Sequence, residues 1–450
     1  MGKRETEKLI EMPIPKLLLS ICSQTTLSVM LFSVYSLMDT FFVARGVGAY
    51  AAGAVSLSAP VVQVIGAFAS MVGAGGASII SRALGKGDVE KAAATAANTF
   101  ALFWGSALLF SIAGLFCLDY LMKLLAADGA LLPYARGYTR IILFGAVTAT
   151  GFSSLIRAEG NIRYSIYQWA IPSLVNLALD PLFIFAFRWG VEGAALSTVI
   201  AQLVSTGMSM YYFFLSKWHF YPIRRRHFHI RPAVMGEVLL IGSPTLLTQL
   251  CSSAYMVAVN HRIDALGGAA ALSAFGIISR LRSFLEMPIS GIVQGLQPIV
   301  SFNHAAGRPD RVREAMRVVV FATIGYGAAV LLLCELLPAQ LMRVFIEDAR
   351  IVSVGVSALR PIALSLPFVG ALTVTAAFFQ SIGKARVAFA LPIISVLLVS
   401  LPALYILSGC FALTGIWYAN PVSEGIKFLI SIAFLRHFIN RQNKKGAVAV

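Results

Sequence analysis

Two polar side chains inside a long apolar segment are the residues best placed to do chemistry. Asn176 and Asp180 lie in the apolar run 166–187, which is long enough to cross a bilayer. Because they are four residues apart, both side chains point the same way on a helix. Pro181 follows and has no N–H, so a carbonyl one turn earlier loses its helical partner. An acid at membrane depth predicts an ion or proton site; the alternative is a helix-end acid near the membrane interface.

The composition places this segment in an integral membrane protein. Of the 450 residues, 58% are hydrophobic and 12% are charged, whereas soluble domains average about 25% charged residues. The apolar runs lack the alternation of a membrane β-barrel, so the spans are expected to be helices. We expect an all-α integral membrane protein with twelve transmembrane helices, at residues 17–44, 51–80, 93–118, 133–156, 165–187, 191–216, 237–263, 269–302, 316–338, 354–380, 387–408 and 412–437.

The positive charge of the chain follows this topology. The net charge is +16, and most basic residues fall in loops that a cytoplasmic N-terminus would place inside, as the positive-inside rule requires. We therefore expect the basic loops to lie next to the lipid bilayer, and we expect no binding to nucleic acid. Both termini are predicted to be cytoplasmic, in the inner (plasma) membrane. The polar stretch 1–16 offers no cleavable signal peptide, and we expect the first helix to serve as the signal.

Short motifs of the first half recur in the second half after 220 to 223 residues. The matches pair Gly48 with Gly268, Gly85 with Gly307, Gly160 with Gly383, Pro172 with Pro392, Pro181 with Pro402, and Gly193 with Gly415. They predict two pseudo-symmetric six-helix lobes at residues 1–216 and 237–450, joined by a cytoplasmic linker loop at 217–236. Six helices per lobe give both lobes the same orientation, with a cavity between them and alternating access by rocking.

The duplication does not extend to the polar pair. Both prolines are kept in the second half, while the positions equivalent to the pair are mostly apolar. Depending on the offset, these positions are Val396 or Leu397, and Leu401 or Ser400. A structural role would have been equally useful in both halves, so the asymmetry favours a functional role for Asp180.

Other polar residues within predicted helices are weaker candidates. Asp39 lies deep in the first helix, with Tyr35 one turn before it on the same face; a buried acid satisfied by neighbouring hydroxyls is the alternative. Glu286 is the most isolated acid of the second half, but Arg280 and Arg282 precede it closely, so an ion pair is an equal alternative to a transport role. Four further side chains could line a substrate cavity or join helices, namely Gln249, Asn260, Gln294 and Gln297.

The motifs of enzymes are missing from the sequence. It contains no phosphate-binding loop, no His-Glu-x-x-His and no Gly-x-Ser-x-Gly, so we expect neither an enzyme nor a cofactor, and energy from an ion gradient. The five cysteines are far apart, mostly inside apolar runs, and are expected to be reduced and buried.

Three motifs in this order resemble the multidrug and toxic compound extrusion (MATE) transporters. They are Met38-Asp39-Thr-Phe-Phe-Val, Arg157-Ala-Glu-Gly-Asn161, and Asn176-Leu-Ala-Leu-Asp180-Pro-Leu-Phe-Ile-Phe with the following Gly190-Val-Glu-Gly-Ala-Ala. The similarity covers about residues 15–440. It implies the V-shaped fold of that family, with two six-helix lobes around a central cavity.

The resemblance to the DinF-like branch of this family also implies a cation-coupling pocket in the first lobe. The positions that match are Asp39, Asn176, Asp180 and Thr198. Their oxygens would bind H⁺ or, alternatively, Na⁺ as the coupling ion. The chain departs from the family pattern in having Cys22 and Gln24 where a proline is frequent, and Ala44 where a glycine is usual.

These observations predict a secondary active multidrug efflux transporter. It would export small amphipathic, often cationic, organic compounds by antiport with H⁺ or Na⁺, and we expect a monomer. Burial disfavours the charged form of a carboxyl, so Asp39 and Asp180 could take up a proton outside and release it inside. The alternative within the superfamily is a lipid-linked oligosaccharide flippase. A membrane-embedded transferase and a receptor or scaffold are the alternatives from other classes.

Overall fold

The computed structural model describes residues 11–47, 49–124, 132–148, 151–216, 220–343 and 349–447. The elements of these ranges are all helices, and they form two compact units. Unit 1 contains Met1–Leu246 and Gln294–Val312, and unit 2 contains Leu247–Val293 and Arg313–Val450. The predicted lobe limits at 1–216 and 237–450 stay a prediction.

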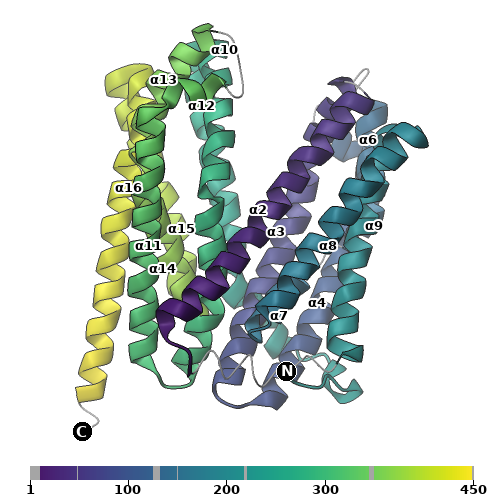
Figure 1. The fold of residues 1–450 in the computed structure, drawn as a ribbon, viewed down its shortest axis with the longest axis vertical. Coiled ribbons are helices and arrows are strands. Elements are labelled where there is room, and N and C mark those ends of the chain that lie inside the picture. The colour runs from purple at the N-terminus through teal and green to yellow at the C-terminus, as the bar shows by residue number, and fades with distance from the viewer. Residues whose placement is uncertain are drawn as a thin grey trace. The chain divides into compact units, whose positions relative to one another are not determined.

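Unit 1 is built from long helices and short connecting turns (Figure 1). Its elements are α2 (Ile14–Gly46), α3 (Ala49–Gly85), α4 (Val89–Phe116), α5 (Leu118–Leu124), α6 (Leu132–Gly145), the 3₁₀ turn η2 (Ala146–Thr148), α7 (Phe152–Ala158), α8 (Ile162–Pro181), the π-helical turn η3 (Leu182–Ala186), α9 (Gly190–Met210), the π-helical turn η4 (Tyr211–Leu215), the 3₁₀ turn η5 (Arg225–Phe228) and both ends of α10 (Pro232–Ala305).

Unit 2 has the same helical character. It contains the middle of α10, most of α11 (Pro309–Leu336), α12 (Pro338–Arg343), α13 (Ala349–Ala363), α14 (Leu366–Ser381), α15 (Ala385–Ile393), the π-helical segment η6 (Ile394–Ser400) and α16 (Leu401–Ala447).

Every predicted transmembrane helix has a helical counterpart in the described part of the chain. Nine helices there are long and apolar enough to cross a membrane, and α13 with α14 adds a tenth span bent by 51°. The long helix α10 is broken at Gly268 (φ 62°, ψ −165°), between the predicted spans 237–263 and 269–302. A second break at Phe411 and Ala412 divides α16 between the spans 387–408 and 412–437. The predicted all-α fold with twelve spans is thus confirmed.

Local sequence explains where the helices near the polar pair begin and end. Asp88 caps α4 by accepting a hydrogen bond from the N–H of Lys91 at 2.9 Å. Asn161 caps α8 in the same way, with the N–H of Tyr164 at 3.2 Å. The π-helical turn η3 starts directly after Pro181, where the missing N–H interrupts the regular helical bonds.

The turn between α3 and α4 and the turn between α10 and α11 have the same backbone conformation, and this corrects one of the matches between the two halves of the sequence. Gly87 and Gly307 both have positive φ, 76° and 71°. In each turn, the N–H of the residue after the glycine donates to the carbonyl five residues earlier. Asp88 N–H donates to Ala83 O, and Arg308 N–H donates to Asn303 O, both at 2.9 Å. The structural partner of Gly307 is therefore Gly87, and the pairing of Gly85 with Gly307 is wrong by two residues.

Glycines let two helices of unit 1 touch backbone to backbone. A Cβ on Gly75 of α3 would lie 2.0 Å from the carbonyl oxygen of Val238 in α10, and one on Gly242 would lie 2.0 Å from that of Met71. Only glycine permits this approach. The cluster of glycines after residue 72 thus serves helix packing.

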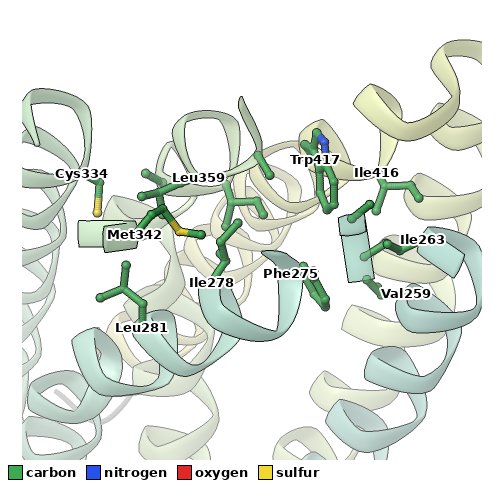
Figure 2. Close-up of a cluster of buried hydrophobic side chains, with 14 of the residues drawn as sticks. Val259, Ile263, Phe275, Ile278, Leu281, Cys334, Met342, Leu359, Ile416 and Trp417 are labelled. Carbon is green, nitrogen blue, oxygen red and sulfur yellow. The ribbon is translucent and has the colours of Figure 1, made fainter. Parts of the chain in front are cut away.

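The core of unit 2 is an apolar cluster that joins α10, α11, α12, α13 and α16 (Figure 2). Phe275 and Trp417 stack at its centre with ring centroids 6.1 Å apart. Ile263, Cys334 and Met342 are fully buried. The cluster holds together helices that are far apart in sequence.

Candidate functional site

Helices α8 and α9 bring the polar pair against two hydroxyl residues. Asn176 and Asp180 lie one turn apart on α8, and Ser197 and Thr198 lie on α9. Asn176, Asp180 and Ser197 are each 0% exposed. The structure therefore brings three of the four predicted cation-coupling residues together, with Asn176 and Asp180 buried and Thr198 half-buried beside them.

Hydrogen bonds link this group through the carboxylate of Asp180. The Ser197 hydroxyl donates to Asp180 Oδ1 in a short hydrogen bond. When the amide nitrogen of Asn176 faces Asp180 Oδ2, it donates across 2.9 Å, and the amide oxygen then accepts from the N–H of Thr198 at 3.2 Å. Two neutral polar groups thus stabilise the charged form of a fully buried carboxyl.

The opposite orientation of the Asn176 amide does not fit its surroundings. Its nitrogen would lie near Ser197 Oγ at 3.2 Å and Thr198 Oγ1 at 3.4 Å. The same nitrogen would also face the N–H of Thr198 at 3.2 Å, one donor against another, and the amide oxygen would face Asp180 Oδ2 at 2.9 Å. The surroundings of Asn176 therefore favour the orientation in which the amide donates to Asp180.

Apolar side chains pack beside this polar group. The carbonyl of Ala194 accepts a hydrogen bond from Thr198 Oγ1 at 3.1 Å. Ala194 also belongs to a buried cluster with Val43 of α2 and Ile184 of η3. This apolar contact keeps bulk water away from α9 next to the site.

The remaining predicted residues of the first half lie on α2. The backbone of Tyr35 and Asp39 is part of this helix, while their side chains lie outside the described residues. Helix α2 packs against α8 along its length (Figure 1). The participation of Asp39 in the site thus stays a prediction.

Sequence reasoning missed Ser197, which makes the most direct bond to Asp180. A hydroxyl in a helix usually bonds a carbonyl of the preceding turn, so Ser197 does not stand out in the sequence. Its oxygen does lie 2.8 Å from the carbonyl of Ala194, but its one hydrogen is needed for the bond to Asp180. One feature of the sequence could have indicated Ser197. It directly precedes the candidate Thr198, after the Gly-Ala-Ala stretch that starts at Gly193.

The predicted substrate-cavity residues of the second half are not joined by hydrogen bonds to one another in the described chain. Gln249 is exposed, and Asn260, Glu286 and Gln294 are half-buried. The first three belong to unit 2, and Gln294 belongs to unit 1. Their role in substrate binding stays a prediction.

Glu286 is part of a charged network in unit 2. Its carboxylate pairs with Arg282 Nε at 2.5 Å, so the ion pair that the sequence left open does form. Arg282 also donates to Asn420 of α16 at 3.0 Å. One turn beyond Asn420, Glu424 pairs with Lys427 at 2.8 Å. The network joins α10 to α16 with its charges compensated.

The cysteines follow the prediction in part. All five are free. Cys22 and Cys334 are buried as expected, whereas Cys117 and Cys410 are exposed. The prediction of burial is wrong for these two because they lie at the end of α4 and beside the break in α16, where packing stops.

A family comparison identifies the kind of protein that carries this site. The family model MatE matches residues 25–182 and 244–406, one stretch in each half. The chain belongs to the MatE family. Members of this family are transporters and not enzymes, as the sequence predicted.

Curated relatives of this MatE chain are named for drug export. It is 25% identical over 398 residues to the multidrug export protein MepA of Staphylococcus saprophyticus, covering 87% of each chain. It is 26% identical over 405 residues to the probable multidrug resistance protein YpnP of Bacillus subtilis, covering 89% of this chain and 88% of that protein.

Solved structures show the same fold. An outward-facing multidrug resistance MATE family transporter of the MOP superfamily matches with a TM-score of 0.92 at 24% identity, covering 97% of this chain and 98% of that one. A MOP superfamily transporter from Pyrococcus furiosus matches with a TM-score of 0.90, also at 24% identity, covering 96% and 97%. The chain is thus a multi-span membrane protein with the MATE fold. The assignment to the DinF-like branch stays a prediction.

Proposed function

We propose that this protein is a multidrug efflux transporter of the plasma membrane that exports small amphipathic, often cationic, organic compounds in exchange for H⁺ or Na⁺. Asp180 carries the coupling ion. The observation that supports this role most strongly is a fully buried carboxyl within a membrane-spanning helix, hydrogen-bonded to a hydroxyl and an amide. The names of the relatives support the export of drugs.

Proton coupling would act on the carboxylate of Asp180. With Asp180 charged, the amide nitrogen of Asn176 and the Ser197 hydroxyl each donate to one carboxylate oxygen. Proton uptake removes a fully buried charge, which burial favours, but it weakens these two hydrogen bonds. The balance of these two effects sets how readily Asp180 takes up and releases the proton.

Sodium coupling would use the same oxygens. The Asp180 carboxylate, the amide oxygen of Asn176 and the hydroxyls of Ser197 and Thr198 are hard ligands of the kind that alkali and alkaline-earth cations prefer. Asp39 would add a second carboxylate from α2. In either case the ion neutralises Asp180, and exchange follows when substrate binds better to the ion-free form.

The oligosaccharide flippase is not favoured, because the curated relatives quoted above are named for multidrug export or resistance. A monomeric state and cytoplasmic termini remain part of this proposal. So does a substrate cavity lined by Tyr35, Gln249, Asn260, Glu286 and Gln294.

Substrate uptake by proteoliposomes under an imposed pH or Na⁺ gradient tests the proposal. We expect Asp180→Asn to abolish gradient-driven uptake while leaving the folded protein intact. Ser400→Ala is the matched control, because Ser400 is one of the residues aligned with Asp180 in the second half and is also 0% exposed. Its buried hydroxyl has no hydrogen-bond partner in the described chain. Uptake by Asp180→Asn at the rate of this control would contradict the proposal.

A further inference from the structure

A segment outside the membrane spans is docked onto unit 1 at three points. From here on, linker means residues 220–231, the part of the predicted loop 217–236 that the structure describes before α10 begins at Pro232. The first point is Glu159, between α7 and α8, whose Oε2 accepts from the N–H of Phe220 and from the hydroxyl of Tyr212, both at 3.0 Å. The hydroxyl of Tyr221, a fully buried residue, faces the same carboxyl.

The second docking point is Glu90, at the start of α4. Its carboxylate accepts from Arg226 Nη2 at 2.9 Å and from His227 Nε2 at 2.9 Å. The ring of His227 is buried, and its Nδ1 accepts the N–H of Arg224 at 3.0 Å. This bond leaves the proton on Nε2, which faces Glu90.

The third docking point is Asn98, about two turns further along α4. Its Oδ1 accepts the N–H of Arg231 at 2.8 Å, and its Nδ2 donates to the carbonyl of His229 at 3.3 Å. Three side chains of unit 1 thus hold the linker along its length. They are the buried acid Glu159, the exposed acid Glu90 and the amide Asn98.

Glu159 is the unusual member of this set. It is 2% exposed, although it lies in a short turn between membrane spans, where an acid is normally solvated. The basic side chain nearest in sequence, Arg157, points to the hydroxyls of Ser154 and Ser165 instead. The titratable groups that do face Glu159 are Tyr212 of η4 and Tyr221 of the linker.

We propose that Glu159 is a proton-binding site, on the side predicted to be cytoplasmic, whose protonation strengthens docking of the linker on unit 1. Docking brings Phe220 and Tyr221 over the carboxyl and removes it from water. A neutral carboxyl accepts this burial more readily than a charged one. Undocking would return the carboxyl to solvent, so proton binding and docking are linked.

The sign of this linkage follows from the pKa of Glu159. Burial raises it from 4.5 to about 7, against the opposing effect of the hydrogen bonds from Phe220 and Tyr212. Between these two pH values the docked state holds a proton that the undocked state has released. Docking therefore weakens as pH rises from about 4.5 to about 7, by up to roughly tenfold per pH unit, and is constant above this window.

Limited cleavage by trypsin in the linker, at the basic run 224–226, tests this proposal on the full-length purified protein. The rate for the wild type is divided by the rate for Glu159→Gln at the same pH. This ratio cancels the pH dependence of trypsin and of every group that both proteins share. We expect the ratio to rise between pH 5 and 7 and to level off above 7. A ratio that is constant from pH 5 to 8 would overturn the proposal.

Two further variants make the outcome specific. Glu90→Gln removes an exposed docking acid, so cleavage should be faster at every pH while the rise that depends on Glu159 remains. Tyr212→Phe removes a donor to the charged carboxyl, so the rise in cleavage rate should level off at a higher pH than in the wild type. An unchanged pH profile for Tyr212→Phe would also overturn the proposal, even if Glu159→Gln fails to fold. None of these measurements depends on transport or on Asp180.

Discussion

Replacing Ser197 by alanine should affect H⁺ and Na⁺ coupling in opposite directions. The Ser197 hydroxyl donates to Asp180 Oδ1 inside a site that is 0% exposed. A hydrogen bond to a charged group contributes about 1.5–3 kcal/mol and one to a neutral group about 0.5–1.5 kcal/mol. Loss of the hydroxyl therefore disfavours charged Asp180 over neutral Asp180 by about 1–1.5 kcal/mol.

This difference sets the size of the expected effect. It corresponds to a factor of roughly 5 to 10 in proton binding. If the coupling ion is H⁺, the proton concentration for half-maximal exchange in Ser197→Ala should fall by this factor. If the ion is Na⁺, an oxygen ligand is lost, and the Na⁺ concentration for half-maximal exchange should rise.

The assay is substrate exchange in proteoliposomes over a series of pH values and Na⁺ concentrations. Ser400→Ala again serves as the control, because it also removes a fully buried hydroxyl from a membrane-spanning segment. Thermal unfolding in detergent shows whether either variant is misfolded. A folded Ser197→Ala protein with wild-type dependence on both ions would refute a role of this hydroxyl at the coupling site.

Two other predictions concern the packing and topology of the chain. Arg282→Leu leaves Glu286 without its cation. Breaking a buried ion pair lowers the free energy of unfolding by about 3–5 kcal/mol. We expect a smaller loss here because the two side chains are 24% and 28% exposed. The melting temperature should fall, and adding Glu286→Leu should restore part of it; a double variant less stable than Arg282→Leu would contradict this reasoning. The exposed thiols of Cys117 and Cys410 lie at helix ends predicted to face outside, so a membrane-impermeant maleimide should label both in intact cells and spare buried Cys22. Labelling only after permeabilisation would reverse the predicted topology.

The sequence was sufficient to predict the helices because the bilayer restricts the choice of structure. Long apolar runs can only be spans, and the breaks at Gly268 and Ala412 fall between predicted spans. Asn176 and Asp180 could also be found, because two polar residues one turn apart in an apolar run need a partner. The identity of that partner, Ser197, depends on how α8 and α9 are rotated against each other, which their own sequences do not specify.

Burial by distant segments was not visible in the sequence either. Glu159 reads as a solvated acid in a turn, and its burial requires Tyr221, about 60 residues later. The error of two residues at Gly307 has a different origin. Gly85 and Gly87 both lie in the same short motif, and only the backbone shows that Gly87 has the positive φ of the turn.

Ion movement measured together with substrate movement tests the central claim about Asp180 most directly. Proteoliposomes would contain a pH-sensitive or Na⁺-sensitive dye, and substrate would be added outside without any imposed gradient. We predict that entry of substrate through the wild-type protein drives the coupling ion outward, and that Asp180→Asn shows no ion movement. Ion movement of wild-type size in Asp180→Asn would contradict the account.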